Sequence, residues 1–123
     1  MVANFEKVKE LLNGEEHEKF LKDGFGEYVT GRITFTIGDN NYTMYFHEGT
    51  VVDVKEGIPL EGMDFGLKGP ISGWKDLFEH RNFSKAVSPK HGKLRHQGNL
   101  IRCMGNLNAT AYICRILCSI VNE

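Results

Sequence analysis

Three cysteines are the residues of this sequence best suited to covalent chemistry, because a thiolate can attack a substrate, ligate a metal or form a disulfide. Cys103, Cys114 and Cys118 all lie in one C-terminal segment with helical periodicity. Positions along one helix are poorly placed for a disulfide, which needs close Cα atoms and converging side chains. Aliphatic residues surround each thiol, and such neighbours raise a thiol pKa. We therefore expect three reduced, buried thiols that act as small hydrophobic side chains.

Histidines are the other candidates for catalysis or metal binding. His80, His91 and His96 have no spacing typical of a zinc site, which would also need cysteine or carboxylate ligands beside them. His96 would share an inward strand face with Leu94, which predicts a core role for it. The sequence has no P-loop, nucleophile elbow or metalloprotease helix, and no obvious carboxylate pair for acid–base catalysis. It therefore predicts a protein that is not an enzyme and uses no cofactor or metal.

Charge is divided unevenly along the chain, although the net charge is only −1. Residues 1–64 carry 13 acids and 6 bases, whereas residues 65–123 carry 9 bases and 3 acids. The stretch 80–102 contains six lysines and arginines and no acid. Two interpretations stay open, an anionic partner or a solvated face that pairs with the acidic N-terminal helices. A pI near 6.5 argues against a nucleic-acid partner, because nucleic-acid binders more often have a pI above about 9 and exposed aromatics interleaved with the bases.

Length and composition predict one domain over residues 1–123. The chain is 41% hydrophobic, and no apolar run approaches the ~18 residues of a membrane span. The first twenty residues are too charged for a secretory signal. We expect a soluble, cytoplasmic domain without integral membrane contact, as a monomer or homodimer.

Hydrophobic periodicity places the elements that must position any site. Helices are expected in 1–30, a sheet with an inserted helix in 31–97, and a closing helix in 98–121. Alternation and glycine turns predict five strands, at 32–37, 42–47, 50–55, 65–69 and 92–97. The first three are expected to be antiparallel neighbours, with Val52 and Val54 inward on the third. The predicted fold class is α+β, an α/β sandwich with a five-stranded, mainly antiparallel sheet covered by helices.

Apolar residues exceed what one layer of core needs. The closing helix carries Ile113, Ile116 and Ile120 outside its main apolar stripe, which fits burial between two layers, the wall of an apolar cavity or a dimer contact. Aromatic and methionine side chains elsewhere either fill the core or line a ligand pocket. Strand alternation and helix stripes give the inward candidates for ligand contact: Phe35, Ile37, Phe46, Phe65, Leu67, Trp74, Leu77, Met104 and Leu117.

From Ile33 onward the ordered pattern resembles a sterol-carrier-protein (SCP-2-like) domain. The segment ITFTIGDNNYTMYFHEGTVVDVKEG is similar to the first three strands of that family, and DFGLKGPISGWKDLFEHRNFSKAV to its fourth strand and following helix. HGKLRHQGNLIRCMGNL is similar to the short strand that leads into the closing helix. The pattern covers about 90 residues, and its order carries the resemblance more than any single motif.

The resemblance implies an apolar tunnel between sheet and helices that accepts a sterol, a fatty acid or an acyl-CoA, and a role in binding or transfer without catalysis. If the ligand is anionic, we expect Lys93, Arg95 and Arg102 near the mouth of the tunnel. The alternative function is a protein-interaction module of the same fold, which docks a partner enzyme through residues 80–90 or the closing helix without a ligand.

Overall fold

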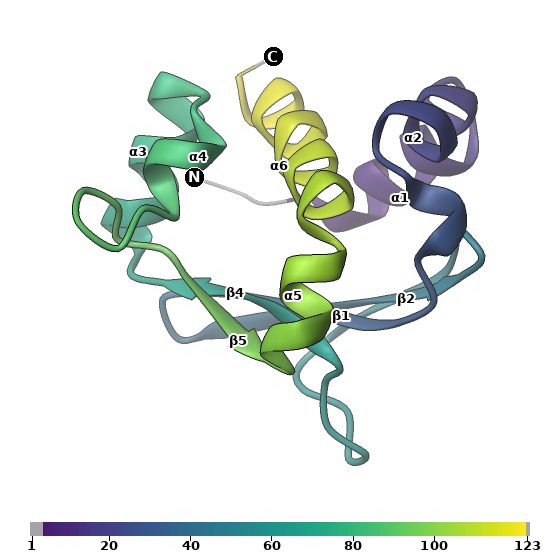
Figure 1. Cartoon of the computed structure of the whole chain (residues 1–123), viewed down its shortest axis with the longest axis horizontal. Helices are drawn as coiled ribbons and strands as arrows, with labels where there is room; N and C mark the ends of the chain where they lie inside the picture. Colours follow the sequence, from purple (N-terminus) through teal and green to yellow (C-terminus); the bar gives the residue numbers. More distant parts are fainter. Residues whose placement is uncertain (1–3, 123) are drawn as a thin grey trace.

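A five-stranded sheet forms one layer of the protein. The computed structural model describes residues 4–122. The strands are β1 (Gly31–Ile37), β2 (Asn40–His47), β3 (Thr50–Glu56), β4 (Phe65–Gly69) and β5 (Arg95–Gly98). Their order is β3-β2-β1-β4-β5, with β1 and β4 parallel and every other pair antiparallel (Figure 1). The predicted meander and the α+β fold class are confirmed, and the sheet is mixed.

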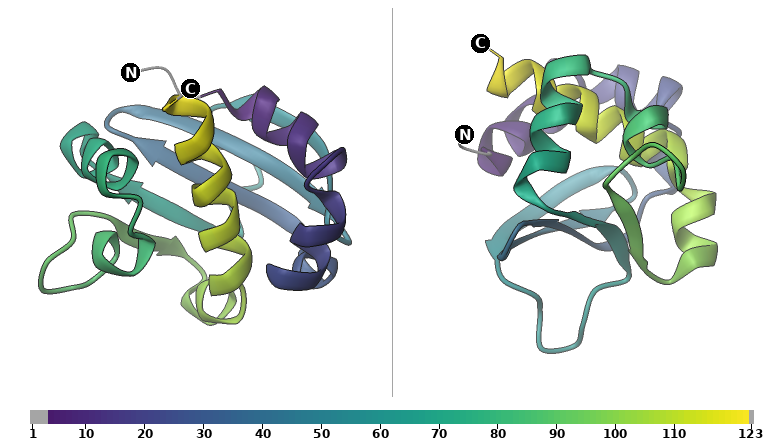
Figure 2. Two further views of the ribbon diagram at one scale, coloured as in Figure 1. Left: turned by 90° about the horizontal axis from the view of Figure 1, so that it is seen from above. Right: turned by 90° about the vertical axis from the view of Figure 1, so that its left-hand side faces the viewer.

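Helices cover one face of this sheet. They are α1 (Phe5–Asn13), α2 (His17–Asp23), the 3-10 turn η1 (Gly26–Tyr28), α3 (Ile71–His80), α4 (Phe83–Ala86), α5 (Leu100–Gly105) and α6 (Leu107–Val121). α6 crosses the sheet diagonally, with α1 and α2 on one side and α3 and α4 on the other (Figure 2). No helix in residues 4–122 is long and apolar enough to cross a membrane.

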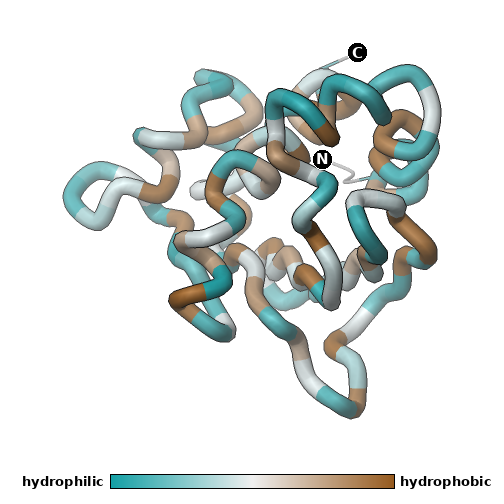
Figure 3. The backbone as a smooth tube through the Cα atoms, turned by 45° about the vertical axis from the view of Figure 1, so that its right-hand side comes forward, coloured by the Kyte–Doolittle hydropathy of each residue, from teal (hydrophilic) through white to brown (hydrophobic). Residues whose placement is uncertain are grey.

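The inner face of the sheet follows the predicted alternation with one exception. Ile33, Phe35 and Ile37 of β1 are at most 4% exposed. On β3 the prediction for Val52 is wrong, because its side chain is 56% exposed while Val51 is buried. The register between β2 and β3 shifts at Tyr45/Phe46. Tyr45 pairs with Asp53 and Phe46 with Val51, so Val52 has no partner on β2. Figure 3 shows hydrophobic and hydrophilic segments interspersed along the whole described backbone.

The closing segment is two helices, whereas one helix over 98–121 was predicted. Asn106 separates them: its backbone departs from helical geometry, and its side-chain amide donates to the Arg102 carbonyl at 2.8 Å. The break turns α5 toward solvent and leaves α6 between the flanking helices. Ile113 and Ile116 are buried, which agrees with the first of the three explanations offered for them, burial between two layers.

The fifth strand is shorter than predicted. β5 begins at Arg95, and residues 88–94 form a loop from which Leu94 reaches back into the core. On the far side of the sheet, residues 57–64 project away from the helices (Figure 2). There Thr34 and Thr43 are fully buried and share a hydrogen bond of 2.8 Å between their hydroxyl oxygens.

Candidate functional site

Eight of the nine predicted ligand-contact residues meet in one apolar cluster between the sheet and the helices. None of the eight is more than 4% exposed. They are Phe35, Ile37, Phe46, Phe65, Leu67, Trp74, Leu77 and Leu117. Trp74 anchors α3 to the sheet, because its indole nitrogen donates to the Thr36 carbonyl at 2.9 Å and its ring meets Phe35 edge-on at 6.3 Å. An apolar tunnel is not seen in residues 4–122, so the tunnel stays a prediction.

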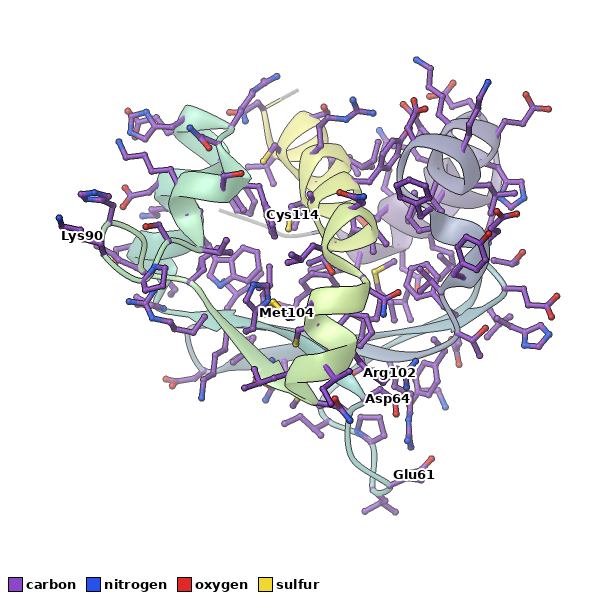
Figure 4. All side chains as sticks on the ribbon, viewed as in Figure 1. Glu61, Asp64, Lys90, Arg102, Met104 and Cys114 are labelled. Carbon is purple, nitrogen blue, oxygen red and sulfur yellow. The ribbon has the colours of Figure 1, made fainter. Side chains whose placement is uncertain are left out.

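Met104 does not join this cluster, and the expectation that it faces inward is wrong. Its side chain is 52% exposed because the break at Asn106 turns α5 away from the core. It lines a surface groove of about 410 Å³ together with Phe25 and Tyr28, which are also exposed. Figure 4 shows Met104 on α5, at the front of the molecule. Sequence periodicity alone had no signal for this break.

The three cysteines are free and buried, as predicted. Cys103 donates to the Gln97 carbonyl at 3.3 Å, and Cys118 lies 3.7 Å from the Leu77 carbonyl. Burial raises the pKa of all three thiols, most strongly that of Cys114. Neutral thiols bonded to backbone carbonyls are poor nucleophiles.

A pocket between α3, α4 and α6 reaches the apolar cluster from outside. It has a volume of about 200 Å³. Leu77, Cys114 and Cys118 are its buried lining residues, and Arg81 stands at its edge. Arg81 ends α3 in the left-handed region with φ of 52°, a conformation that costs a non-glycine residue about 1–2 kcal/mol. The sequence placed Arg81 in the basic stretch 80–102 and in the predicted docking segment 80–90, and the fold brings it to this pocket.

Burial and the charge of Arg81 have opposite effects on the pKa of the Cys118 thiol in this pocket. Burial raises the pKa of the Cys118 thiol, and the positive charge of Arg81 offsets only part of that effect. The pocket therefore combines neutral, apolar inner residues with two exposed cations, Arg81 and Arg115. Amphiphilic anions have the complementary pattern, an apolar tail and a charged end.

The three predicted headgroup residues do not converge on one mouth. Lys93 lies 3.5 Å from the Asp76 carboxylate, beside α3. Arg95 donates to backbone carbonyls of its own loop. Arg102 is on α5, 3.2 Å from Asp64. Within residues 4–122, the ion pairs of the basic stretch 80–102 are therefore formed with Asp64 and Asp76. In the same described range, none is formed with the acidic residues of α1 and α2.

Asp64 lies at the centre of a polar cluster with Arg32 and Arg102. Its carboxylate accepts from the Arg32 amide at 2.7 Å, and Arg102 lies on its other side and also donates to the Thr30 carbonyl (Figure 4). Burial alone would raise the pKa of Asp64, but the hydrogen bonds from Arg32 and the charges of Arg102 and Arg32 outweigh it and lower the pKa. The cluster ties β1, α5 and the 57–64 loop together.

His96 is only half-buried, beside Leu67 on the neighbouring strand. Burial lowers its pKa, which favours the neutral imidazole. It therefore contributes to the inner face of the sheet as an uncharged ring, close to the predicted core role.

The architecture is shared with known proteins, although the sequence is not. No protein-family profile matches the chain, and no curated protein is similar to it in sequence. The solved structure of sterol carrier protein 2 superposes with a TM-score of 0.64 at 14% identity, covering 91% of this chain and 93% of that one. The chain has the sterol-carrier-protein fold.

Two further structures support this assignment of the fold. A Thermus thermophilus protein, described as conserved, hypothetical and a candidate sterol carrier protein, gives a TM-score of 0.62 at 13% identity over 95% of this chain and 90% of that one. Sterol carrier protein 2 from Yarrowia lipolytica in its apo form gives 0.55 at 18% identity over 92% and 88%. The fold implied by the sequence resemblance is confirmed.

Proposed function

We propose that this chain is a non-catalytic carrier that holds a lipid-like molecule between its sheet and its helices. The sterol-carrier-protein fold supports this function, and so does the pocket between α3, α4 and α6, whose inner residues already belong to the apolar cluster. Sterols, fatty acids and acyl-CoA esters are the ligand classes with enough apolar surface. Each Å² of that surface removed from water contributes about 25 cal/mol.

A ligand must reshape this core, because the pocket of about 200 Å³ is smaller than the roughly 300–1,000 Å³ typical of whole-ligand sites. The tail would extend from the pocket past Leu77 and Cys114 toward the sheet. A carboxylate at the other end would meet Arg81, whose guanidinium makes no ion pair within residues 4–122. Arg115 also lines the pocket, but its guanidinium lies over the Tyr112 ring at 4.4 Å, so Arg81 is our headgroup candidate.

Absence of catalysis is part of the proposal. All three thiols have raised pKa values, and those of Cys103 and Cys118 also donate toward backbone carbonyls, so none is activated. A carrier needs only an apolar surface of the right shape and a way to open it. Such a function agrees with the chemistry of the side chains that surround the pocket.

The test is native mass spectrometry of the purified protein, followed by extraction and identification of any bound lipid. We then compare oleate binding by Ser119→Trp, which places a large ring at the pocket, with binding by Ser84→Trp, on the exposed side of α4 and outside the pocket. Oleate affinity should fall at least about tenfold in the first variant only. An unchanged affinity in Ser119→Trp, or no binding of oleate, sterol or acyl-CoA by the natural chain, would refute the proposal.

A protein-interaction module is the second candidate, and exposed apolar side chains favour it. Leu100, Ile101 and Met104 of α5 are 63%, 84% and 52% exposed. Single exposed hydrophobic residues are ordinary, but neighbouring ones mark binding surfaces. This candidate predicts that Ile101→Ser abolishes capture of a partner enzyme and leaves lipid affinity unchanged. The carrier proposal is tested by lipid affinity alone and makes no prediction about partner capture.

A further inference from the structure

A second pocket, distinct from the one proposed for the lipid, lies on the other side of α4. It has a volume of about 250 Å³ and lies between α3, α4 and the 88–94 loop. We call it the cationic pocket and define it by its lining residues: Gly73, Asp76, Leu77, His80, Asn82, Lys85, Ala86, His91, Gly92 and Lys93. Six of these ten residues carry polar side chains, in contrast to the apolar inner lining of the first pocket.

The loop that forms one wall of the cationic pocket is held in place by its backbone. The Gly92 amide donates to the Ser88 carbonyl at 2.8 Å, and the Leu94 amide donates to Ala86 of α4 at 3.1 Å. Gly92 approaches α4 so closely that a Cβ there would lie 2.0 Å from the Ala86 carbonyl oxygen. The shape of this wall therefore depends on a glycine at position 92.

Arg95 closes the same loop from outside. Its guanidinium donates at 2.7 Å to the Gly92 carbonyl, at 2.8 Å to the Leu94 carbonyl and at 3.4 Å to the Pro89 carbonyl. Arg95 is thus a positioning residue for the loop. The loop places His91 and Lys93 in the lining of the pocket. Lys90, at the outer tip of the loop, is not among the lining residues (Figure 4).

Charge in the cationic pocket is positive and incompletely paired. Lys93 lies 3.5 Å from Asp76, but both side chains are more than half exposed, and such a pair contributes little. The Lys85 ammonium makes no hydrogen bond or ion pair within residues 4–122. Two lysines against one carboxylate leave the pocket with one net positive charge even when both histidines are neutral.

Hydrogen-bond donors approach this charge from several sides. Asn82 uses its side-chain oxygen to cap α4, accepting from the Lys85 amide at 3.1 Å, which leaves its NH₂ group for a ligand. His80 enters from α3 and His91 from the loop, and each imidazole offers an N–H donor. No group of three His, Cys, Asp or Glu residues in the described chain is arranged to hold a metal ion. The donors therefore suit an anion with several acceptor oxygens.

We propose that the cationic pocket binds a phosphate monoester group. A phosphate monoester carries about −1.5 to −2 charges and three strong acceptor oxygens, which matches two ammonium groups and neutral donors on separate elements. The polar lining suits a charged headgroup and not the apolar tail of a lipid. Leu77 also lines the pocket proposed for the lipid, so the phosphate comes either from a water-soluble compound or from the headgroup of an amphiphile.

Titration of ¹⁵N-labelled protein with glycerol 3-phosphate, at fixed ionic strength, tests the inference. We expect saturable amide shifts confined to 80–93, an affinity about tenfold lower in Lys85→Gln, and no change in Lys90→Gln. Lys90→Gln is a matched control, because it removes the same charge from the neighbouring loop but outside the pocket. Absence of saturable shifts, or equal weakening in both variants, would overturn the inference.

Two lipid probes identify the source of the phosphate. Oleoyl lysophosphatidate that binds at least about tenfold more tightly than glycerol 3-phosphate, with the difference reduced in Lys85→Gln, supports a lipid headgroup. Equal affinity supports a water-soluble phosphate compound. Oleoylglycerol, which has no phosphate, reports on the lipid pocket alone. The proposed function can therefore fail, with no binding of oleate, sterol, acyl-CoA or oleoylglycerol, while the phosphate pocket stands.

Discussion

Asp64→Asn should destabilise the fold at neutral pH and much less in acid. The substitution keeps the shape of the side chain and an acceptor for the Arg32 amide at 2.7 Å, but it removes the charge that faces Arg102 at 3.2 Å. Hydrogen bonds to charged groups contribute about 1.5–3 kcal/mol, and half-exposed ion pairs about 0–1 kcal/mol. Because the asparagine side-chain oxygen still accepts the hydrogen bond from Arg32, part of the hydrogen-bond contribution remains. We therefore expect the free energy of unfolding to fall by about 1–2 kcal/mol, or Tm by about 3–8 °C.

The pH dependence of this loss follows from the direction of the pKa shift. The folded-state pKa of Asp64 lies below its ordinary value of 3.8, so the carboxylate stabilises the fold above that pH. This stabilisation is lost as pH falls through the folded-state pKa. Urea unfolding of Asp64→Asn and of the natural chain, from pH 7 to about pH 3, should give curves that converge in acid.

Asp39→Asn is the matched control, because Asp39 is exposed in the β1–β2 turn and its substitution removes the same charge. It should leave the free energy of unfolding within about 0.5 kcal/mol of the natural value. A difference between Asp64→Asn and the natural chain that stays constant down to about pH 3 would refute the electrostatic reasoning, and so would an equal effect of Asp39→Asn.

Two other predictions test the packing of the sheet and the state of the thiols. Gly66→Ala should cost at least about 3 kcal/mol or prevent folding, because the added Cβ would lie 1.8 Å from the Thr34 carbonyl oxygen. Gly105→Ala, with nothing within 4 Å of its Cβ, should be neutral in the same thermal unfolding assay. The three buried thiols should react with an aromatic disulfide reagent only after unfolding in urea. Rapid modification of the native protein near neutral pH would contradict that expectation.

Strand alternation predicted the sheet well because it reports burial directly. Ile33, Phe35 and Ile37 face the helices as expected, since a strand with one buried face has only one register that hides all three. The parallel pairing of β1 with β4 has no such local signal. It depends on the 57–64 loop, whose end is fixed by contacts of Asp64 with β1 and α5.

Irregular backbone explains the errors at Val52 and Met104. Both predictions continued a regular period through a position where the backbone changes, at the irregularity in β3 and at the break before α6. The polar groups that stabilise the break, such as Asn106, are compatible with a continuous helix when only the sequence is read. Sequence proximity also does not show how the predicted headgroup residues are arranged, since Lys93, Arg95 and Arg102 are close in sequence but lie on a loop, a strand and a helix.

We expect a ligand to reach the core through α4, and this route links the two pockets. α6 is held near its middle, where the Tyr112 hydroxyl donates to Glu16 at 2.6 Å, and at its C-cap, where the Asn122 side-chain amide donates to the Phe78 carbonyl at 2.8 Å. α4 has only four residues and separates the lipid pocket from the cationic pocket, with Phe83 lining the first and Lys85 the second.

A phosphate monoester bound at Lys85 should therefore change the affinity for a lipid that displaces Phe83. By thermodynamic reciprocity the lipid must change the affinity for the phosphate by the same factor. Calorimetric titration of oleate with and without saturating glycerol 3-phosphate measures that factor, and Lys85→Gln should bring it to one. An oleate affinity that glycerol 3-phosphate leaves unchanged would mean that α4 stays fixed, and the ligand would then have to reach the core between α6 and another neighbour.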